Sequence, residues 1–121
     1  MRLLLPLFLA LAVADAGPGK PPLERVIPVT AERFKYTPSV IELRVGEAVV
    51  LELTSLDRRH GFEVPELKVD QTIEPGKVTR VRLTPERPGV YPFHCNVFCG
   101  SGHEEMAGEI RVTSRPSEAT R

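Results

Sequence analysis

The chain has 121 residues, of which 41% are hydrophobic and 26% are charged, and its 16 basic and 16 acidic side chains balance to a formal net charge of zero. A chain of this length can form one domain around a single hydrophobic core. The balanced charge gives no basic surface for nucleic acid or anionic membranes, so these two classes of partner are excluded.

The first segment along the chain has the layout of a secretory signal peptide. Arg2 precedes an apolar run at 3–13, and residues 14–16, Ala-Asp-Ala, form a small-residue cleavage site. This run is shorter than the roughly 20 apolar residues that a membrane-spanning helix needs, although its retention as an uncleaved anchor stays open. The sequence therefore predicts a signal peptide at 1–16, an exported periplasmic or extracellular protein, and no membrane span after cleavage.

The remaining residues predict short strands. Residues 17–24 form an extended linker rich in proline and glycine, and residues 114–121 form a polar tail. Between them, in a domain at 25–113, apolar residues alternate over short runs and show no helical period; the runs are 40–45, 48–53, 77–83, 90–95 and 108–113. Six to eight such strands, separated by Pro-Gly turns, predict an all-β fold, an antiparallel Greek-key β-sandwich or barrel. One helical turn is expected at 102–106, in the loop before the last strand.

That loop concentrates soft metal-binding side chains. The segment YPFHCNVFCGSGHEEM contains both cysteines of the chain, Cys95 and Cys99, followed by His103 and Met106. In an exported protein two close cysteines form a disulfide by default, and zinc held by both cysteines, His103 and His60 is an alternative. Neither explains Met106, whose thioether favours copper. Thiolate, imidazole and thioether together are typical of copper electron-transfer sites. The extra cysteine favours a binuclear over a mononuclear site, and all four alternatives stay open.

The segment CNVFCGSGHEEM resembles the C-x₃-C-x₃-H-x₂-M motif of the CuA domain, found in subunit II of haem–copper oxidases and in nitrous-oxide reductase. The upstream segment DRRHGFEVPELKVDQTIEPGKVTRVRL is similar to the first-histidine strand of that family, and the likeness extends over about 34–113. The resemblance implies a cupredoxin-like domain with a binuclear centre of two copper ions. The residues that it implies as ligands are His60, Cys95, Val97 through its backbone carbonyl, Cys99, His103 and Met106.

The resemblance also implies the role of each ligand and of the protein. The two cysteines bridge the coppers, one histidine binds each copper, and the methionine and the carbonyl are weak ligands. In the oxidised state the coppers share one unpaired electron, and the implied function is one-electron transfer with a redox protein such as a c-type cytochrome or an oxidase. The chain is not expected to be an enzyme by itself. A copper carrier for oxidase assembly and a mononuclear blue-copper-like electron carrier are the alternative functions.

Some residues depart from the family or lie beside the motif. Oxidase subunits usually receive electrons through an exposed tryptophan, but this sequence contains none; Phe34, Tyr36 and Phe98 are the nearest aromatic substitutes. Strand alternation predicts that His94 points away from the core. Asp57 is a candidate either to orient the loop of His60 or to cap a turn.

Overall fold

The computed structural model describes residues 24–114. The predicted signal peptide lies outside the described residues, as do the predicted linker and tail apart from residues 24 and 114. The described part contains nine strands and two single-turn 3-10 helices, which are β1 Arg25–Glu32, β2 Lys35–Thr37, β3 Val40–Arg44, β4 Val49–Ser55, β5 His60–Val64, η1 Pro65–Leu67, β6 Val69–Ile73, β7 Thr79–Leu83, β8 Gly89–His94, η2 His103–Glu105 and β9 Ala107–Thr113.

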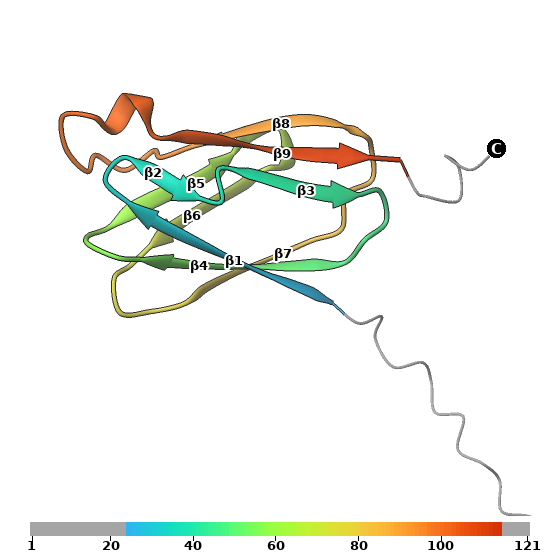
Figure 1. Cartoon of the computed structure of the whole chain (residues 1–121), viewed down its shortest axis with the longest axis horizontal. Helices are drawn as coiled ribbons and strands as arrows, with labels where there is room; N and C mark the ends of the chain where they lie inside the picture. The colour runs from blue at the N-terminus through green and yellow to red at the C-terminus, as the bar shows by residue number, and fades with distance from the viewer. Residues whose placement is uncertain (1–23, 115–121) are drawn as a thin grey trace, which may run out of the picture.

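The strands form two sheets that pack face to face (Figure 1). The first sheet has the order β2-β1-β4-β7 and the second has the order β3-β9-β8-β5-β6, which confirms the predicted β-sandwich. Two pairs, β1 with β4 and β3 with β9, are nevertheless parallel, so the sheets are mixed rather than purely antiparallel. Parallel partners need a crossover connection. Here the crossover includes a strand of the other sheet: between β1 and β4, which share one sheet, the chain forms β3 in the second sheet.

The core lies between the sheets and follows the period-2 pattern of the sequence. In β7, Val81 is buried, while Arg80 and Arg82 point to solvent. In β4, Val49, Leu51 and Leu53 are all buried, as the alternation predicts. Phe62 and Phe93 are fully buried in the core, with their ring centroids 4.7 Å apart. These apolar contacts give the sandwich a rigid interior on which loops at its ends are held.

Strand β5 breaks the alternation because a loop covers its outer side. Its residues His60, Gly61 and Phe62 are consecutive and all buried. A Cβ atom on Gly61 would lie 2.8 Å from the backbone nitrogen of Asn96 and 3.0 Å from that of Val97. The loop after β8 therefore packs directly on the backbone of β5, and only a residue without a side chain allows this approach.

Strand β1 is the longest element that the sequence did not predict. Pro28 interrupts its run, and proline normally argues against a central strand. In the structure β2 pairs with β1 only at residues 30–32, while β4 pairs along residues 25–31. Pro28 therefore has a strand on one side only, where proline is tolerated.

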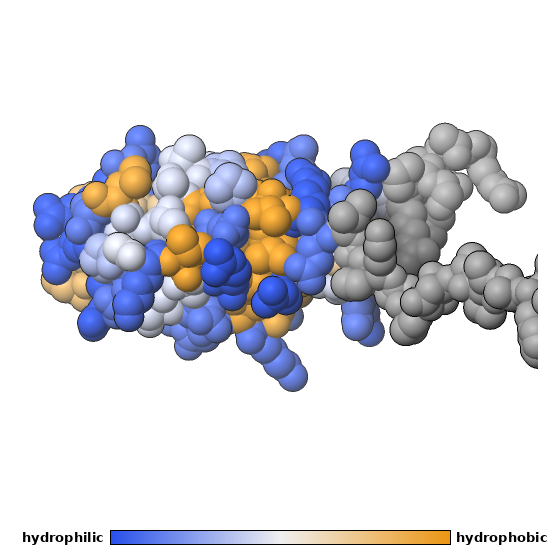
Figure 2. Space-filling view, turned by 90° about the horizontal axis from the view of Figure 1, so that it is seen from below, coloured by the Kyte–Doolittle hydropathy of each residue, from blue (hydrophilic) through white to orange (hydrophobic). Residues whose placement is uncertain are grey.

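The surface mixes charged and apolar side chains. Figure 2 shows apolar side chains between charged ones on the side of the sandwich that carries β1, β4 and β7. Large apolar residues that are exposed in the described part are Val26, Val40, Leu56, Val78, Val90 and Phe98. Within residues 24–114, neither helix approaches the length and apolar character that crossing a bilayer requires.

Candidate metal centre

Two loops at one end of the sandwich carry the predicted ligands. The β4–β5 loop leads into His60, the first residue of β5, and the β8–β9 loop contains residues 95–106. The second loop is closed at its base because the backbone N–H of Cys95 donates to the carbonyl of Met106 over 3.1 Å. The single turn of η2 is the helical turn that the sequence predicts, and it carries His103, whose ring lies close to Cys99.

All six predicted residues lie together at this end. The Sγ atoms of Cys95 and Cys99 are 3.9 Å apart, and these two atoms and a ring nitrogen of His60 lie within 4.8 Å of one another. The other three predicted residues are adjacent. His103 Nδ1 lies 3.7 Å from Cys99 Sγ, Met106 Sδ lies 4.0 Å from Cys99 Sγ, and the carbonyl of Val97 lies 3.1 Å from Cys95 Sγ.

The cluster is largely shielded from solvent. Cys99, Met106 and His60 are fully buried, and Cys95 is 3% exposed. His103 is half-buried, and its ring centroid lies 5.9 Å from that of Phe98. Phe98 is 74% exposed. His103 is thus the most solvent-accessible imidazole or sulfur side chain of the cluster, and an exposed aromatic ring lies beside it.

A hydrogen bond to Asp57 sets which ring nitrogen of His60 acts as the donor. Its Nε2 lies 2.7 Å from a carboxylate oxygen of Asp57. An ionised carboxylate only accepts, so Nε2 is the donor, and in the neutral imidazole Nδ1 then presents a lone pair. Nδ1 is buried and has no hydrogen-bond partner among the residues that the structure describes. A buried polar atom without a partner is costly, and a metal ion held by the neighbouring sulfurs would satisfy it.

The donor set fits copper better than zinc. Both cysteines are free thiols, and their 3.9 Å separation is far longer than the roughly 2.05 Å of a disulfide bond. Two sulfurs, two imidazoles and a thioether are soft or borderline donors, the class that copper prefers. A zinc site of two cysteines and two histidines would leave the buried Met106 sulfur without a role.

A backbone contact that the sequence did not reveal supports the cysteine pair. The N–H of Gly61 donates to Cys95 Sγ over 3.2 Å, and the hydroxyl of Tyr36 donates to the carbonyl of Gly61 over 2.7 Å. Burial, followed by the proximity of both thiols, raises the pKa of Tyr36. Backbone donors leave no mark in a side-chain motif, so only the register of β5 against the loop discloses this contact.

The aromatic substitutes for tryptophan separate in the structure. Tyr36 is only 3% exposed, and its ring packs against Phe93 at 4.9 Å between centroids. It is a core residue and offers no exposed ring for electron entry. Phe34 is half-buried and covers the ligand loop, where a Cβ on Gly102 would lie 2.5 Å from its ring. Phe98 is the exposed ring.

His94 lies beside the site and outside the cluster. Its Nε2 is 3.0 Å from a carboxylate oxygen of Glu63, and its side chain is 46% exposed. The prediction that it points outward is confirmed. The strand therefore presents His94 to solvent and the adjacent Cys95 to the interior, as period-2 alternation requires.

The thiol of Cys99 gives a pH dependence that can be tested. Burial, followed by the neighbouring Cys95, raises its pKa from 9.0 to about 11. The folded, metal-free protein therefore binds this proton more tightly than the unfolded chain does. We expect the protonated Cys99 thiol to make its full contribution to the free energy of unfolding below pH 9. As the pH rises towards 11, this contribution is lost and the free energy of unfolding falls. Urea unfolding of the reduced protein across this range measures the fall, and a Cys99→Ser variant should show a shallower one. An equal fall in both proteins would contradict the assignment.

Comparison with known proteins agrees with the fold. The sequence model of the cupredoxin-like domain family matches residues 3–112. Cytochrome c oxidase subunit 2 of Thermus thermophilus is 40% identical over 103 residues, which cover 85% of this chain and 73% of that protein. A second Thermus thermophilus protein of the same name is equally similar, and the chain spans 59% of its length. Nitrous-oxide reductase of Ralstonia nicotianae is 30% identical over 88 residues, 69% of this chain and 14% of that enzyme.

A solved structure shows the same fold. The periplasmic domain of subunit II of cytochrome oxidase from Bradyrhizobium japonicum superposes with a TM-score of 0.72 at 18% identity, covering 83% of this chain and 91% of that one. The relatives as a group support an electron-transfer domain with copper as its metal. The chain belongs to the cupredoxin-like domain family, and its relatives include subunit 2 of cytochrome c oxidase.

Proposed function

We propose that this chain is an exported electron-transfer protein with a binuclear copper centre. The observation that supports it is the convergence of two thiols, two imidazoles, a thioether and a carbonyl at one end of a rigid sandwich. In the proposal Cys95 and Cys99 bridge two ions, and His60 and His103 bind one ion each. Met106 and the carbonyl of Val97 are weak ligands. Copper bound there would supply a one-electron couple.

The protein's part is to hold these donors still. Cys95 and Met106 are tied by a backbone hydrogen bond at the base of the loop, and His60 is held separately, as the first residue of β5. Ligands that keep their positions in both redox states lower the reorganisation that electron transfer requires. The buried surroundings also lower the local dielectric, which tunes the potential of a metal site.

Two ions are proposed rather than one because of the second cysteine. A mononuclear blue-copper site uses one cysteine, two histidines and a weak axial ligand. Here the thiols of Cys95 and Cys99 face each other at 3.9 Å, and each has its own imidazole nearby. A single blue-copper ion would take both imidazoles but only one of the two cysteines, so it would leave one buried thiol without a partner.

The proposed partner is a redox protein such as a c-type cytochrome or an oxidase. The relatives named as cytochrome c oxidase subunit 2 belong to such an assembly, and the proposed role is to relay electrons without a reaction of its own. The proposed compartment, the periplasm or the cell exterior, follows from the predicted signal peptide. Phe98, exposed beside His103, offers a short path from a docked partner to the centre.

Copper delivery for oxidase assembly is the alternative function, and metal exchange separates the two. We expect an electron-transfer centre to lose copper slowly to a strong chelator, because its ligands are buried, and to be reduced rapidly by a ferrous c-type cytochrome. Both rates can be followed by visible absorption. Fast loss of copper together with slow reduction would favour delivery and contradict electron transfer.

Replacing Met106 with leucine should retain the centre and change its potential. Leucine fills the same buried volume, and swaps of this kind cost less than about 1.5 kcal/mol. Loss of the thioether removes electron donation to the oxidised state, so the reduction potential should rise, on the order of 60 mV for a tenfold change in the one-electron equilibrium. Redox titration measures the shift. An unchanged potential would remove Met106 from the proposed ligand set.

A further inference from the structure

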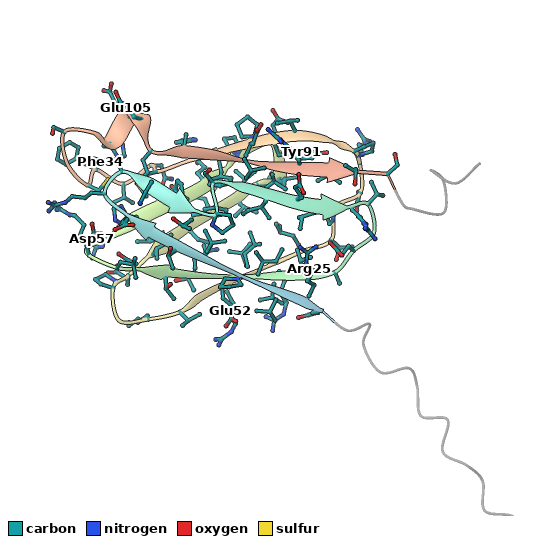
Figure 3. All side chains as sticks on the ribbon, in the orientation of Figure 1. Arg25, Phe34, Glu52, Asp57, Tyr91 and Glu105 are labelled. Atoms are coloured by element: carbon teal, nitrogen blue, oxygen red, sulfur yellow. The ribbon has the colours of Figure 1, made fainter. Side chains whose placement is uncertain are left out.

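Asp57 contacts both His60, a proposed ligand, and the turn that carries Phe34. It belongs to the loop between β4 and β5, three residues before His60. In Figure 3, Asp57 and Phe34 lie at the same end of the sandwich as the ligand loop that carries Glu105. The two carboxylate oxygens of Asp57 have different partners: one contacts the ring of His60, and the other contacts the backbone of Arg33.

The first oxygen, Oδ1, faces His60. It lies 2.7 Å from His60 Nε2, and it also accepts the backbone N–H of Arg58 over 2.6 Å. This contact places the proton of His60 on Nε2 and leaves the lone pair of Nδ1 free. Carboxylates that accept from the far nitrogen of a metal-binding histidine fix both its tautomer and its ring orientation.

The second oxygen, Oδ2, faces the turn between β1 and β2. It accepts the backbone N–H of Arg33 over 2.8 Å, across 24 residues of sequence. The next residue is Phe34, whose ring lies over the ligand loop within 2.5 Å of the Cβ position of Gly102 and 3.0 Å of that of Gly100. One carboxylate therefore holds both the imidazole of His60 and the turn that places Phe34 over the ligand loop.

We propose that Asp57 is a positioning residue that selects the metal-competent tautomer of His60 and clamps the Phe34 turn over the ligand loop. Only the expected effect on copper binding rests on the function proposed above. The tautomer itself is a property of the metal-free protein. Asp57 touches no proposed ligand atom directly and acts through His60 and Arg33.

An Asp57→Asn substitution separates this role from ordinary packing. Asparagine has the same shape, but it offers one carbonyl oxygen and one amide that can only donate. If the oxygen faces His60, the amide meets the N–H of Arg33 and the clamp opens. If the amide faces His60, Nε2 must accept, so the proton moves to Nδ1 and points at the thiols. Neither orientation preserves both contacts.

Glu52→Gln is the matched control, because it makes the same change of carboxylate to amide at an ion pair away from the site. Glu52 lies on β4, 3.2 Å from Arg80, and Figure 3 shows it on the outer side of the sandwich, apart from Asp57. We expect this variant to match the wild-type protein in every site measurement, whatever its effect on the unfolding temperature.

The first readout is the ¹⁵N chemical shifts of the His60 ring in metal-free, reduced protein. We expect a protonated Nε2 and a bare Nδ1 in the wild type and in Glu52→Gln, and a population with protonated Nδ1 in Asp57→Asn. An Asp57→Ala variant, which offers Nε2 neither an acceptor nor a donor, should show mixed tautomers. Identical shifts in all four proteins would overturn the proposal, and so would a protonated Nδ1 in the wild type.

The second readout is the rate of copper loss to a chelator. Substituting a partner of this kind typically lowers metal affinity 10- to 100-fold, so we expect Asp57→Asn to lose copper faster by about that factor. If Asp57→Asn lowers the unfolding temperature but leaves the His60 chemical shifts and the rate of copper loss equal to those of the wild type, Asp57 is merely structural and the proposal is overturned. If the wild type takes up no copper but the shifts change as expected, the proposed function fails and the role of Asp57 stands.

Discussion

Replacing Cys95 or Cys99 with serine should abolish the signature of a two-copper centre. A serine hydroxyl is a hard donor that stays protonated at neutral pH, so it cannot serve as a soft bridging ligand as a thiolate does. Both thiols are buried and 3.9 Å apart, and the donors beside them, the Met106 thioether and the Val97 carbonyl, are neutral groups that do not replace a bridging thiolate. Copper content and the electron paramagnetic resonance spectrum of each variant measure the effect.

The control for these variants is their fold. A buried hydroxyl in place of a thiol costs about 1–3 kcal/mol if it finds no partner, and unfolding of the metal-free proteins shows whether the sandwich survives. A folded Cys95→Ser or Cys99→Ser protein that still binds two coppers with a shared electron would refute the bridging assignment. Retention of a single copper with an altered spectrum would agree with it.

A methyl group on Gly61 should be nearly as damaging, although glycine is no ligand. The Cβ of a Gly61→Ala variant would lie 2.0 Å from Asn96 Oδ1 and 2.8 Å from the backbone nitrogen of Asn96. The Asn96 side chain is itself held by Asp70 over 2.9 Å, so the loop backbone must move away from β5. That movement lengthens the hydrogen bond from Gly61 to Cys95 Sγ. We expect a loss of about 1–3 kcal/mol in stability, typical of overpacking, and loss of tight copper binding.

Gly76→Ala provides the comparison for Gly61→Ala. Gly76 lies in the turn before β7 with φ of 80°, and a Cβ there meets nothing within 4 Å. Its substitution costs about 1–2 kcal/mol through backbone strain alone, but it should leave the copper spectrum unchanged. Equal copper binding by both variants would show that the close approach of loop and strand does not position the centre.

The sequence predicted the parts of the fold that side-chain patterns encode. Alternation in residues 77–83 located β7 and its inward face, because a half-buried strand must alternate apolar and polar residues. The ligand loop was found because Cys95, Cys99, His103 and Met106 are close in sequence. The remote His60 could be offered from the residues alone only as a possible fourth ligand, since no local pattern relates residues so far apart, and its assignment as a copper ligand relied on the resemblance to a family.

Other features depend on tertiary contacts that no local pattern records. The parallel pairing of β1 with β4 follows from the crossover between the sheets, and β1 was missed because Pro28 interrupts its run. The hydrogen bond from Gly61 to Cys95 involves a backbone N–H, which every residue except proline provides. The burial of Tyr36 is a further example, because an aromatic residue in a short strand is equally compatible with a surface and a core position.

The central claim is the binuclear copper centre, and one measurement tests it most directly. The purified chain is reduced, loaded with copper and freed of excess metal, and its copper content and electron paramagnetic resonance spectrum are recorded on the same sample. We predict two coppers per chain and one unpaired electron shared equally by both nuclei. One copper per chain, with the hyperfine pattern of a single nucleus, would contradict the claim, as would no tightly bound copper.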